Sequence, residues 1–210
     1  MDLVFFGMQG SGKGTQGKLI AERHNLKVFE TGAELRKLAS EDSGLGEKVK
    51  EIIEAGHLVS NEIVMEIIEN FAENIPEGES VIFDGIPRKM EQAESFNALM
   101  EKLGREFMGV LIKISEKTAL KRLTTRRICS KCKEVYPADY KEKSCEKCGG
   151  ELITRSDDNA DSIKNRLTAY QNETLPVIEK YKSEGKMIEI NGEGSVEEVD
   201  TLLENSLNLQ

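Results

Sequence analysis

The feature that most constrains this 210-residue chain is a glycine-rich segment near its amino terminus. It reads GMQGSGKGTQ over residues 7–16, with four glycines within eight residues around Lys13, and it follows the apolar run Asp2–Phe6. Glycines let successive backbone N–H groups turn onto phosphate oxygens, and a helix that starts there adds partial positive charge. The segment therefore predicts a strand, a phosphate-binding loop and a helix, with Lys13 reaching the β and γ phosphates. Glycines that only end a strand tightly are the plainer alternative.

Strand-like and helix-like patterns alternate along the rest of the chain. The segment SVIFDG over residues 80–85 is apolar on consecutive positions, as expected of a strand buried on both faces. Further strands are predicted at FMGVLIKI and KMIEI, and three successive helices precede residue 80, the first from a capping-box pair, Thr31 and Glu34. Strands that alternate with helices indicate an α/β fold with a parallel sheet and right-handed crossovers.

Glycine and proline mark several predicted helix ends. The helix GEKVKEIIEA is expected to stop at Gly56, in a left-handed conformation. Another helix is predicted from Glu116 to Arg127. A long helix over residues 160–183 is expected to be interrupted or kinked by Pro176, because proline lacks the backbone N–H that a helix interior needs.

The formal net charge of −9 limits the partners of the chain. It repels nucleic acid and anionic membranes at long range, so nonspecific binding to either is not expected. The N-terminus lacks the basic region of a signal peptide, and no apolar run approaches the roughly 20 residues that span a bilayer. We therefore expect a cytoplasmic protein without a nucleic-acid or membrane partner, in which any anionic ligand meets a local cluster of cations.

All four cysteines lie in one segment, as Cys129-x2-Cys132 and Cys145-x2-Cys148 with twelve residues between the pairs. Cytosolic thiols are kept reduced, which disfavours disulfides or a redox pair, and the spacing is typical of a tetrahedral four-thiolate metal site. Protein ligands fill all four positions, so we expect structural rather than catalytic zinc, with iron as the other candidate metal. An insertion of about 40 residues is too small to bury a core, so the metal would hold it together.

The form G-x-x-G-x-G-K-G-T resembles the nucleoside monophosphate kinases, and adenylate kinases in particular; Gln9 stands where that family commonly has proline. The resemblance covers nearly the whole chain through the segments TGAELR, DGIPRKMEQ, RLTTRR, RSDD and KNRL. The cysteine segment, with CGGELITRSDDN, resembles a metal-bearing branch of the family, whose lid closes over ATP.

The resemblance implies a P-loop NTPase three-layer fold with a parallel five-stranded sheet. It also implies three parts: a core over residues 1–29, 60–121 and 159–210, a helical insertion for the monophosphate over 30–59, and a small zinc-binding lid over 122–158. We expect a monomer.

The family's functional residues can be matched to this chain position by position. Implied ATP contacts are Gly10, Ser11, Gly12, Lys13, Gly14, Thr15, Arg122 and Arg126. Implied AMP contacts are Thr31, Gly32, Arg36, Val59, Gly85, Arg88 and Gln92. Implied catalytic residues are Lys13, Asp84, Arg88, Arg122, Arg126, Arg155 and Arg166, with Asp84 orienting Mg²⁺ through its waters. A turn-forming aspartate before Gly85 is the alternative for Asp84.

Six of the nine arginines fall on these implied positions, and the chemistry accounts for them. In-line phosphoryl transfer needs alignment and fixed positive charge more than covalent help. Arginine suits this task because its planar fork is always charged and binds phosphate with two hydrogen bonds.

The function that the resemblance implies is reversible, Mg²⁺-dependent phosphoryl transfer from ATP to AMP, which gives two ADP under a closing lid. One alternative keeps the enzyme class and changes a substrate, for instance GTP as donor or another monophosphate as acceptor. A different class is a zinc-ribbon module on a P-loop scaffold that binds nucleic acid or protein. Its support is an excess of nine Lys/Arg over four Asp/Glu between Lys121 and Gly150.

Overall fold

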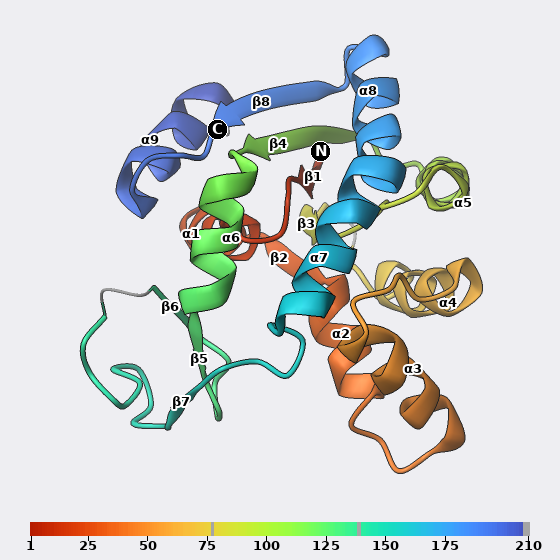
Figure 1. Ribbon diagram of the computed structural model, residues 1–210. Helices are drawn as coiled ribbons and strands as arrows, with labels where there is room; N and C mark the ends of the chain where they lie inside the picture. The colour runs from red at the N-terminus through yellow and green to blue at the C-terminus, as the bar shows by residue number, and fades with distance from the viewer. Residues whose placement is uncertain (77, 138–139, 208–210) are drawn as a thin grey trace.

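The computed structural model describes residues 1–76, 78–137 and 140–207 and has a five-stranded parallel sheet at its centre (Figure 1). The strand order is β2-β3-β1-β4-β8, and every neighbouring pair is parallel. The strands are β1 (Asp2–Phe6), β2 (Lys27–Glu30), β3 (Val81–Asp84), β4 (Phe107–Lys113) and β8 (Met187–Asn191). The predicted α/β fold with a parallel five-stranded sheet is therefore confirmed.

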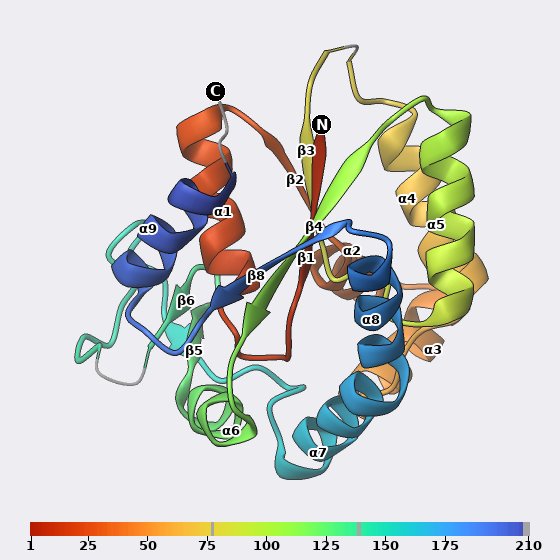
Figure 2. The same cartoon turned by 90° about the horizontal axis from the view of Figure 1, so that it is seen from above.

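Helices cover both faces of this sheet, which gives three layers (Figure 2). One face carries α1 (Lys13–His24) and α9 (Val196–Leu207). The other carries α4 (Asn61–Ala72), α5 (Met90–Lys102) and α8 (Leu175–Ser183). Because both faces are covered, successive residues of β1 are all buried: Leu3 and Phe5 pack towards α9, and Val4 and Phe6 towards α8.

Two smaller units project from the same end of the sheet. The helices α2 (Thr31–Leu38) and α3 (Gly44–Glu54) lie on one side of α7 (Ala160–Ala169), and α6 (Glu116–Thr125) leads into a small sheet on the other side (Figure 1). The end of α3 touches the start of α7. Asn165 Nδ2 donates to Ala55 O at 2.9 Å, and Gly56, at φ 79°, lies so close that a Cβ would be 2.5 Å from Ser162 O.

The small sheet consists of β5 (Arg127–Cys129), β6 (Val135–Tyr136) and β7 (Leu152–Ile153), antiparallel in the order β6-β5-β7. The prediction of a helix up to Arg127 is wrong at its end, because α6 stops at Thr125 and the chain turns extended to pair in β5. Of the predicted lid, residues 138–139 lie outside the described residues, as do 77 and 208–210 of the predicted core.

The predicted interruption of the long helix over 160–183 is confirmed, and it extends over a whole turn. A π-helical segment, η1 (Tyr170–Thr174), separates α7 from α8, with Pro176 in the first turn of α8. The Leu175 N–H donates to Tyr170 O, which is the wider i to i+5 spacing. The missing N–H of Pro176 explains why the regular pattern breaks just before it.

The predicted capping box at Thr31 is wrong. The N-cap of α2 is Glu30, with no side-chain cap, and Thr31 is already helical. The Thr31 hydroxyl is buried and has no partner among the described residues, so it is free for another contact.

In the described part of the chain, no helix combines the length and the apolar character needed to cross a membrane.

Candidate active site

The loop between β1 and α1 is built on three glycines with positive φ. Gly7, Gly10 and Gly12 have φ values of 147°, 83° and 96°. A Cβ on Gly7 would lie 2.5 Å from Ile112 O of β4, so a larger residue cannot pack there. Helix α1 begins at Lys13 without an acidic residue in its first turn, and that turn also contains Gly14 and Thr15. The loop and the helix start therefore present backbone N–H groups suited to an anion.

Lys13 points back across this loop. Its Nζ donates to Gly7 O at 2.7 Å and to Met8 O at 3.2 Å. Burial lowers the pKa of Lys13 to about 8; Asp84 opposes this shift and Arg88 adds to it. The ammonium group is therefore poorly solvated and gains from an anion placed beside it.

Two side-chain oxygens of the loop, and one at the start of α2, are buried and unpaired. Gln9 Oε1, Ser11 Oγ and Thr31 Oγ1 have no hydrogen-bond partner within the described residues. Buried polar atoms are nearly always paired, so unpaired ones gathered at a glycine-rich loop indicate contacts that a ligand completes.

Asp84 ends β3, the strand next to β1. A Cβ on Gly14 would lie 3.5 Å from Asp84 Oδ2 and 3.8 Å from Glu30 Oε1, so both carboxylates face the start of α1. Burial raises the pKa of Asp84, while Lys13 and Arg88 lower it. Carboxylate oxygens beside a phosphate loop are the ligands that a hydrated Mg²⁺ requires, so the donor set fits that metal.

Two arginines come from the segments after β2 and β3, the strands on the same side of β1 as Asp84. Arg36 comes from α2, and burial and then Arg155 lower its pKa to about 10. A Cβ on Gly32 would lie 3.1 Å from Arg36 Nη1. Arg88 Nε donates to Gly85 O at 2.8 Å, and a Cβ on Gly85, at φ 85°, would be 2.6 Å from Arg88 Nη2. Both glycines leave room for the guanidinium group beside them.

The backbone of Arg88 is held on both sides. Its N–H donates to Gln92 Oε1 at 2.8 Å, and its carbonyl accepts from the Thr174 hydroxyl at 2.9 Å. Gln92 is nearly fully buried, and Val59 lies in the same core as the insertion helices. In this arrangement Gln92 positions Arg88.

Three further arginines share two adjacent aspartates. Arg126 makes a two-bond pair with Asp158 at 2.6 and 2.7 Å, and Arg155 makes another with Asp157 at 2.9 and 2.8 Å. Arg166 contacts Asp157 Oδ2 at 3.3 Å and Asp158 Oδ1 at 2.8 Å. Burial acts to raise the pKa of Asp157, but Arg155 and Arg166 together lower it below its usual value. The two carboxylates hold the three guanidinium groups in fixed orientations. Because there are three arginines and two aspartates, the group keeps a net positive charge.

Arg122 connects the phosphate loop to the chain after β8. Its Nη2 donates to Gly192 O at 3.1 Å and to Gly194 O at 3.2 Å, and its Nη1 lies 3.4 Å from Gly10 O. Gln16 Nε2 donates to Val196 O at 2.9 Å. Residues 192–196 therefore form a wall beside the loop.

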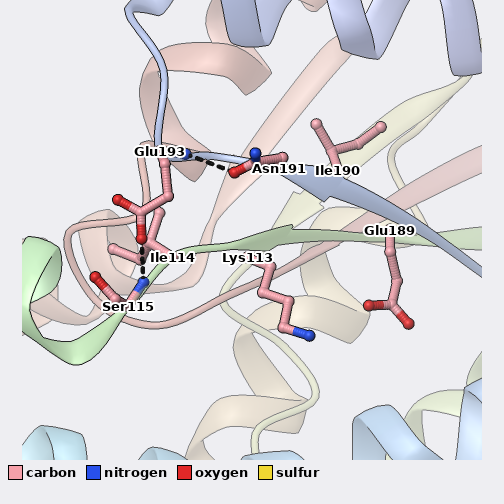
Figure 3. Close-up of a pocket in the computed structure, with 7 residues that line it drawn as sticks. All are labelled: Lys113, Ile114, Ser115, Glu189, Ile190, Asn191 and Glu193. Carbon is pink, nitrogen blue, oxygen red and sulfur yellow. Dashed lines mark hydrogen bonds between the residues drawn. The ribbon is translucent and has the colours of Figure 1, made fainter.

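Glu193 anchors this wall to the start of α6 (Figure 3). Its carboxylate accepts from the Ser115 N–H and, at 2.6 Å, from the Thr118 hydroxyl, and its own N–H donates to Asn191 Oδ1 at 3.1 Å. The hollow of about 480 Å³ beside it is lined by residues at and just after the ends of β4 and β8, and it includes none of the predicted site residues.

The four cysteines meet in the small sheet region. Their Sγ atoms all lie within 4.8 Å of one another, and two pairs, Cys129 with Cys148 and Cys132 with Cys145, are 3.4 Å apart. Zn–S bonds of about 2.3 Å place tetrahedral ligands about 3.8 Å from one another, so the donor set fits zinc.

The two cysteine pairs adopt the same turn. Lys133 and Gly149, the residues after each pair, both have positive φ, at 61° and 68°, and their N–H groups donate to Cys129 O and Cys145 O. Although burial opposes the thiolate, hydrogen bonds from the Tyr136 hydroxyl and a backbone N–H lower the pKa of Cys145 to about 6.

Known proteins match this chain over most of its length. A family model described as adenylate kinase matches residues 5–186. An adenylate kinase from Fervidobacterium nodosum is 37% identical over 213 aligned positions, which cover 99% of this chain and 97% of the relative. The chain belongs to the adenylate kinase family. An adenylate kinase from Archaeoglobus fulgidus is 33% identical, over 97% of this chain and 98% of the relative.

The family assignment confirms the resemblance that the sequence analysis described. As a member of this family, the protein is a nucleotide-binding phosphotransferase. Of the residues predicted from the resemblance, Lys13 and Arg88 line one cavity at the phosphate loop, and Arg126, Arg155 and Arg166 share two aspartates. The four cysteines form a cluster of their own. Sequence analysis missed Asp157 and Asp158 as partners of the arginines, although the position of Asp157 two residues after Arg155 was a signal for that local pair. It also missed residues 192–196, whose two glycines after a strand were the available signal.

The lowered pKa of Lys13 predicts how nucleotide binding by this adenylate kinase depends on pH. Phosphate binds the protonated amine, so affinity for ATP should be flat below about pH 8 and then fall, by up to about tenfold per pH unit, as the free amine loses its proton. Isothermal titration between about pH 7.5 and 9.5 measures this fall. Lys13→Arg should remove the break near pH 8; an identical profile in that variant would contradict the assignment.

Proposed function

We propose that this adenylate kinase transfers the terminal phosphoryl group of Mg²⁺·ATP to AMP, reversibly, and so forms two ADP. The observation that carries the proposal is a cavity of about 40 Å³ with Lys13 on one side and Arg88 on the other. The first belongs to the phosphate loop, and the second to the loop after β3. A phosphoryl group passed between two nucleotides must travel through such a gap.

The donor nucleotide would lie along the phosphate loop. Lys13 and the N–H groups of residues 10–15 would bind its phosphates, with Arg122, Arg126 and the wall of residues 192–196 beside them. The acceptor would lie towards the insertion, where the Thr31 hydroxyl is unpaired and Arg36 and Arg88 carry the positive charge. Val59 and Gln92 would stand near its base.

Catalysis would rest on position and charge. Arg88, Arg126, Arg155 and Arg166 would surround the phosphoryl group as its negative charge spreads over three oxygens. Asp157 and Asp158 hold three of these forks in fixed orientations, so little reorganisation is needed when the charge develops.

Bound Mg²⁺ would shield the phosphate charges, and Asp84 would hold its waters with Glu30 nearby. Replacing Asp84 with asparagine is expected to raise the Mg²⁺ concentration that gives half-maximal rate by about tenfold or more, because the neutral amide attracts the hydrated ion weakly. A magnesium titration at saturating ATP and AMP measures this. An unchanged magnesium dependence would leave Asp84 as a turn former only.

We further propose that the chain acts as a cytoplasmic monomer with three moving parts. These are a core of residues 1–29, 60–121 and 159–210, an acceptor insertion of residues 30–59, and a lid of residues 122–158 held by structural zinc. Closure of the lid would exclude the water that otherwise hydrolyses ATP. Light scattering of the purified protein tests the monomer.

A coupled assay of ADP formation tests the function. ATP and AMP should give the highest rate, and replacing AMP by GMP, CMP or UMP, or ATP by GTP, should lower it. A preference for another acceptor or donor would move the enzyme to a related monophosphate kinase. Salt-dependent RNA binding without ADP formation would favour the zinc-ribbon module.

A further inference from the structure

Gln9 carries a side chain that the functions described so far leave unexplained. It is the third residue of the phosphate loop, between Gly7 and Gly10. Its Oε1 is buried and has no hydrogen-bond partner among the described residues. A carboxamide offers both a strong acceptor and two donors, so leaving it unpaired inside a protein is unfavourable unless another molecule pairs with it.

Gln9 lies at the cavity between the two proposed nucleotide sites. Gln9 lines the same space of about 40 Å³ as Lys13 and Arg88, together with Tyr170 and Thr174 from the π-helical segment. A space of that size has room for a small group such as a phosphoryl group. Gln9 is therefore placed at the gap that the phosphoryl group would cross.

The charges around the cavity decide which end of the amide faces inward. Lys13 and Arg88 make the space suited to an anion, and a phosphoryl oxygen is an acceptor only. The oxygen and nitrogen of an amide exchange places by rotation about the last side-chain bond. An anion in the cavity therefore selects the orientation in which the Gln9 Nε2 donors point towards it.

We propose that Gln9 is a further catalytic residue, whose Nε2 donates a hydrogen bond to a non-bridging oxygen of the phosphoryl group in transit. The proposal rests on the proposed phosphoryl transfer. No covalent bond to Gln9 forms; the amide stabilises negative charge that is greatest midway between the nucleotides, as a preorganised neutral donor does. Its contribution therefore appears in kcat more than in the binding of either nucleotide.

The test compares two substitutions at Gln9 with a matched one on the surface. Gln9→Met keeps the length and removes the donors, Gln9→Glu replaces them with negative charge, and Gln171→Met makes the first change at an exposed residue of the π-helical segment. Gln9→Met should lower kcat by about 10- to 100-fold with KM for ATP and AMP nearly unchanged. Gln9→Glu should lower it at least as much, and Gln171→Met should not alter it.

Two further measurements separate this role from a structural one. Gln9→Met removes an unpaired buried group, so its melting temperature should equal or exceed that of the parent, whereas loss of a structural contact would lower it. Affinity for a dinucleotide with five bridging phosphates, which threads the cavity, should fall in Gln9→Glu. If the parent forms ADP and Gln9→Met keeps kcat within about twofold, or changes only KM, Gln9 has no part in transfer. If the parent itself forms no ADP, the proposed function fails first, and this inference with it.

Discussion

Replacing Arg88 with methionine is expected to lower kcat by about 10³-fold or more while the free protein remains as stable as before. Methionine preserves much of the side-chain length but removes the charge and the fork that binds phosphate. Burial lowers the pKa of Arg88; Asp84 opposes this, and Arg166 and Arg155 add to it. The free site holds several arginines close together, so removing the charge of Arg88 relieves repulsion among them. Functional sites commonly reduce the stability of the free protein in this way.

The rate is measured by coupled ADP formation and the stability by thermal unfolding of the free protein. Arg23→Met is the matched control. Arg23 lies on α1, far from Arg88 in the sequence, and it pairs at the surface with Asp200 and Glu204 of α9. It should leave kcat unchanged, and loss of such a surface pair costs at most about 1 kcal/mol. A loss of less than tenfold in Arg88→Met, or an equal loss in both variants, would contradict a role for Arg88 in transfer.

Removal of the metal is expected to unfold the lid while the core remains folded. Among the described residues, the hydrophobic cluster of the lid buries only Cys129, Tyr136 and Cys145, with Tyr140 and Leu152 packed against them, so little apolar burial supports it without metal. Structural zinc contributes on the order of 10 kcal/mol in small modules. Treatment with a mercurial and a chelator should release a single zinc ion per chain, speed proteolysis between residues 129 and 153, and raise KM for ATP about tenfold or more.

A pair of substitutions separates the metal from general damage to the lid. Cys132→Ser removes an exposed ligand and should reproduce the effects of metal removal, whereas Ser144→Ala changes an exposed neighbour and should reproduce none. The two clusters of the core, on either face of the central sheet, contain no lid residue, so the main unfolding transition should persist. Protein purified without chelator that contains neither zinc nor iron would refute the metal site.

The three inner strands of the central sheet, β3, β1 and β4, could be predicted from the sequence because they are buried on both faces. Runs such as Leu3–Phe6 and Val81–Phe83 are apolar at every position, a pattern that helices at the surface do not share. The strands of the lid could not, since β6 and β7 are two residues each and carry no measurable period. Their pairing depends on the turns that the cysteines impose.

Local patterns also misled where tertiary contacts decide the outcome. Thr31 and Glu34 have the spacing of a capping box, yet the Thr31 hydroxyl is buried without a partner among the described residues and caps nothing. A capping pattern and a ligand contact use the same residue types, so only the fold distinguishes them.

The arginines of the site could be anticipated from the resemblance, but the way they are held could not. Asp158 reaches Arg126, more than thirty residues earlier in the chain, only because the lid begins and ends beside the same helix pair. Arg122 likewise meets Gly192 across seventy residues. Such contacts form only when the fold brings distant segments of the chain together, so no spacing in the sequence predicts them.

Phosphorus NMR of the purified protein with ADP and Mg²⁺ alone tests most directly whether two nucleotides exchange a phosphoryl group within one site. ATP and AMP should appear in equal amounts and at the same rate, with no free phosphate, and the reaction should stop at an equilibrium reachable from either side. ADP that remains unchanged, or AMP and phosphate formed without ATP, would contradict the transfer between paired nucleotides.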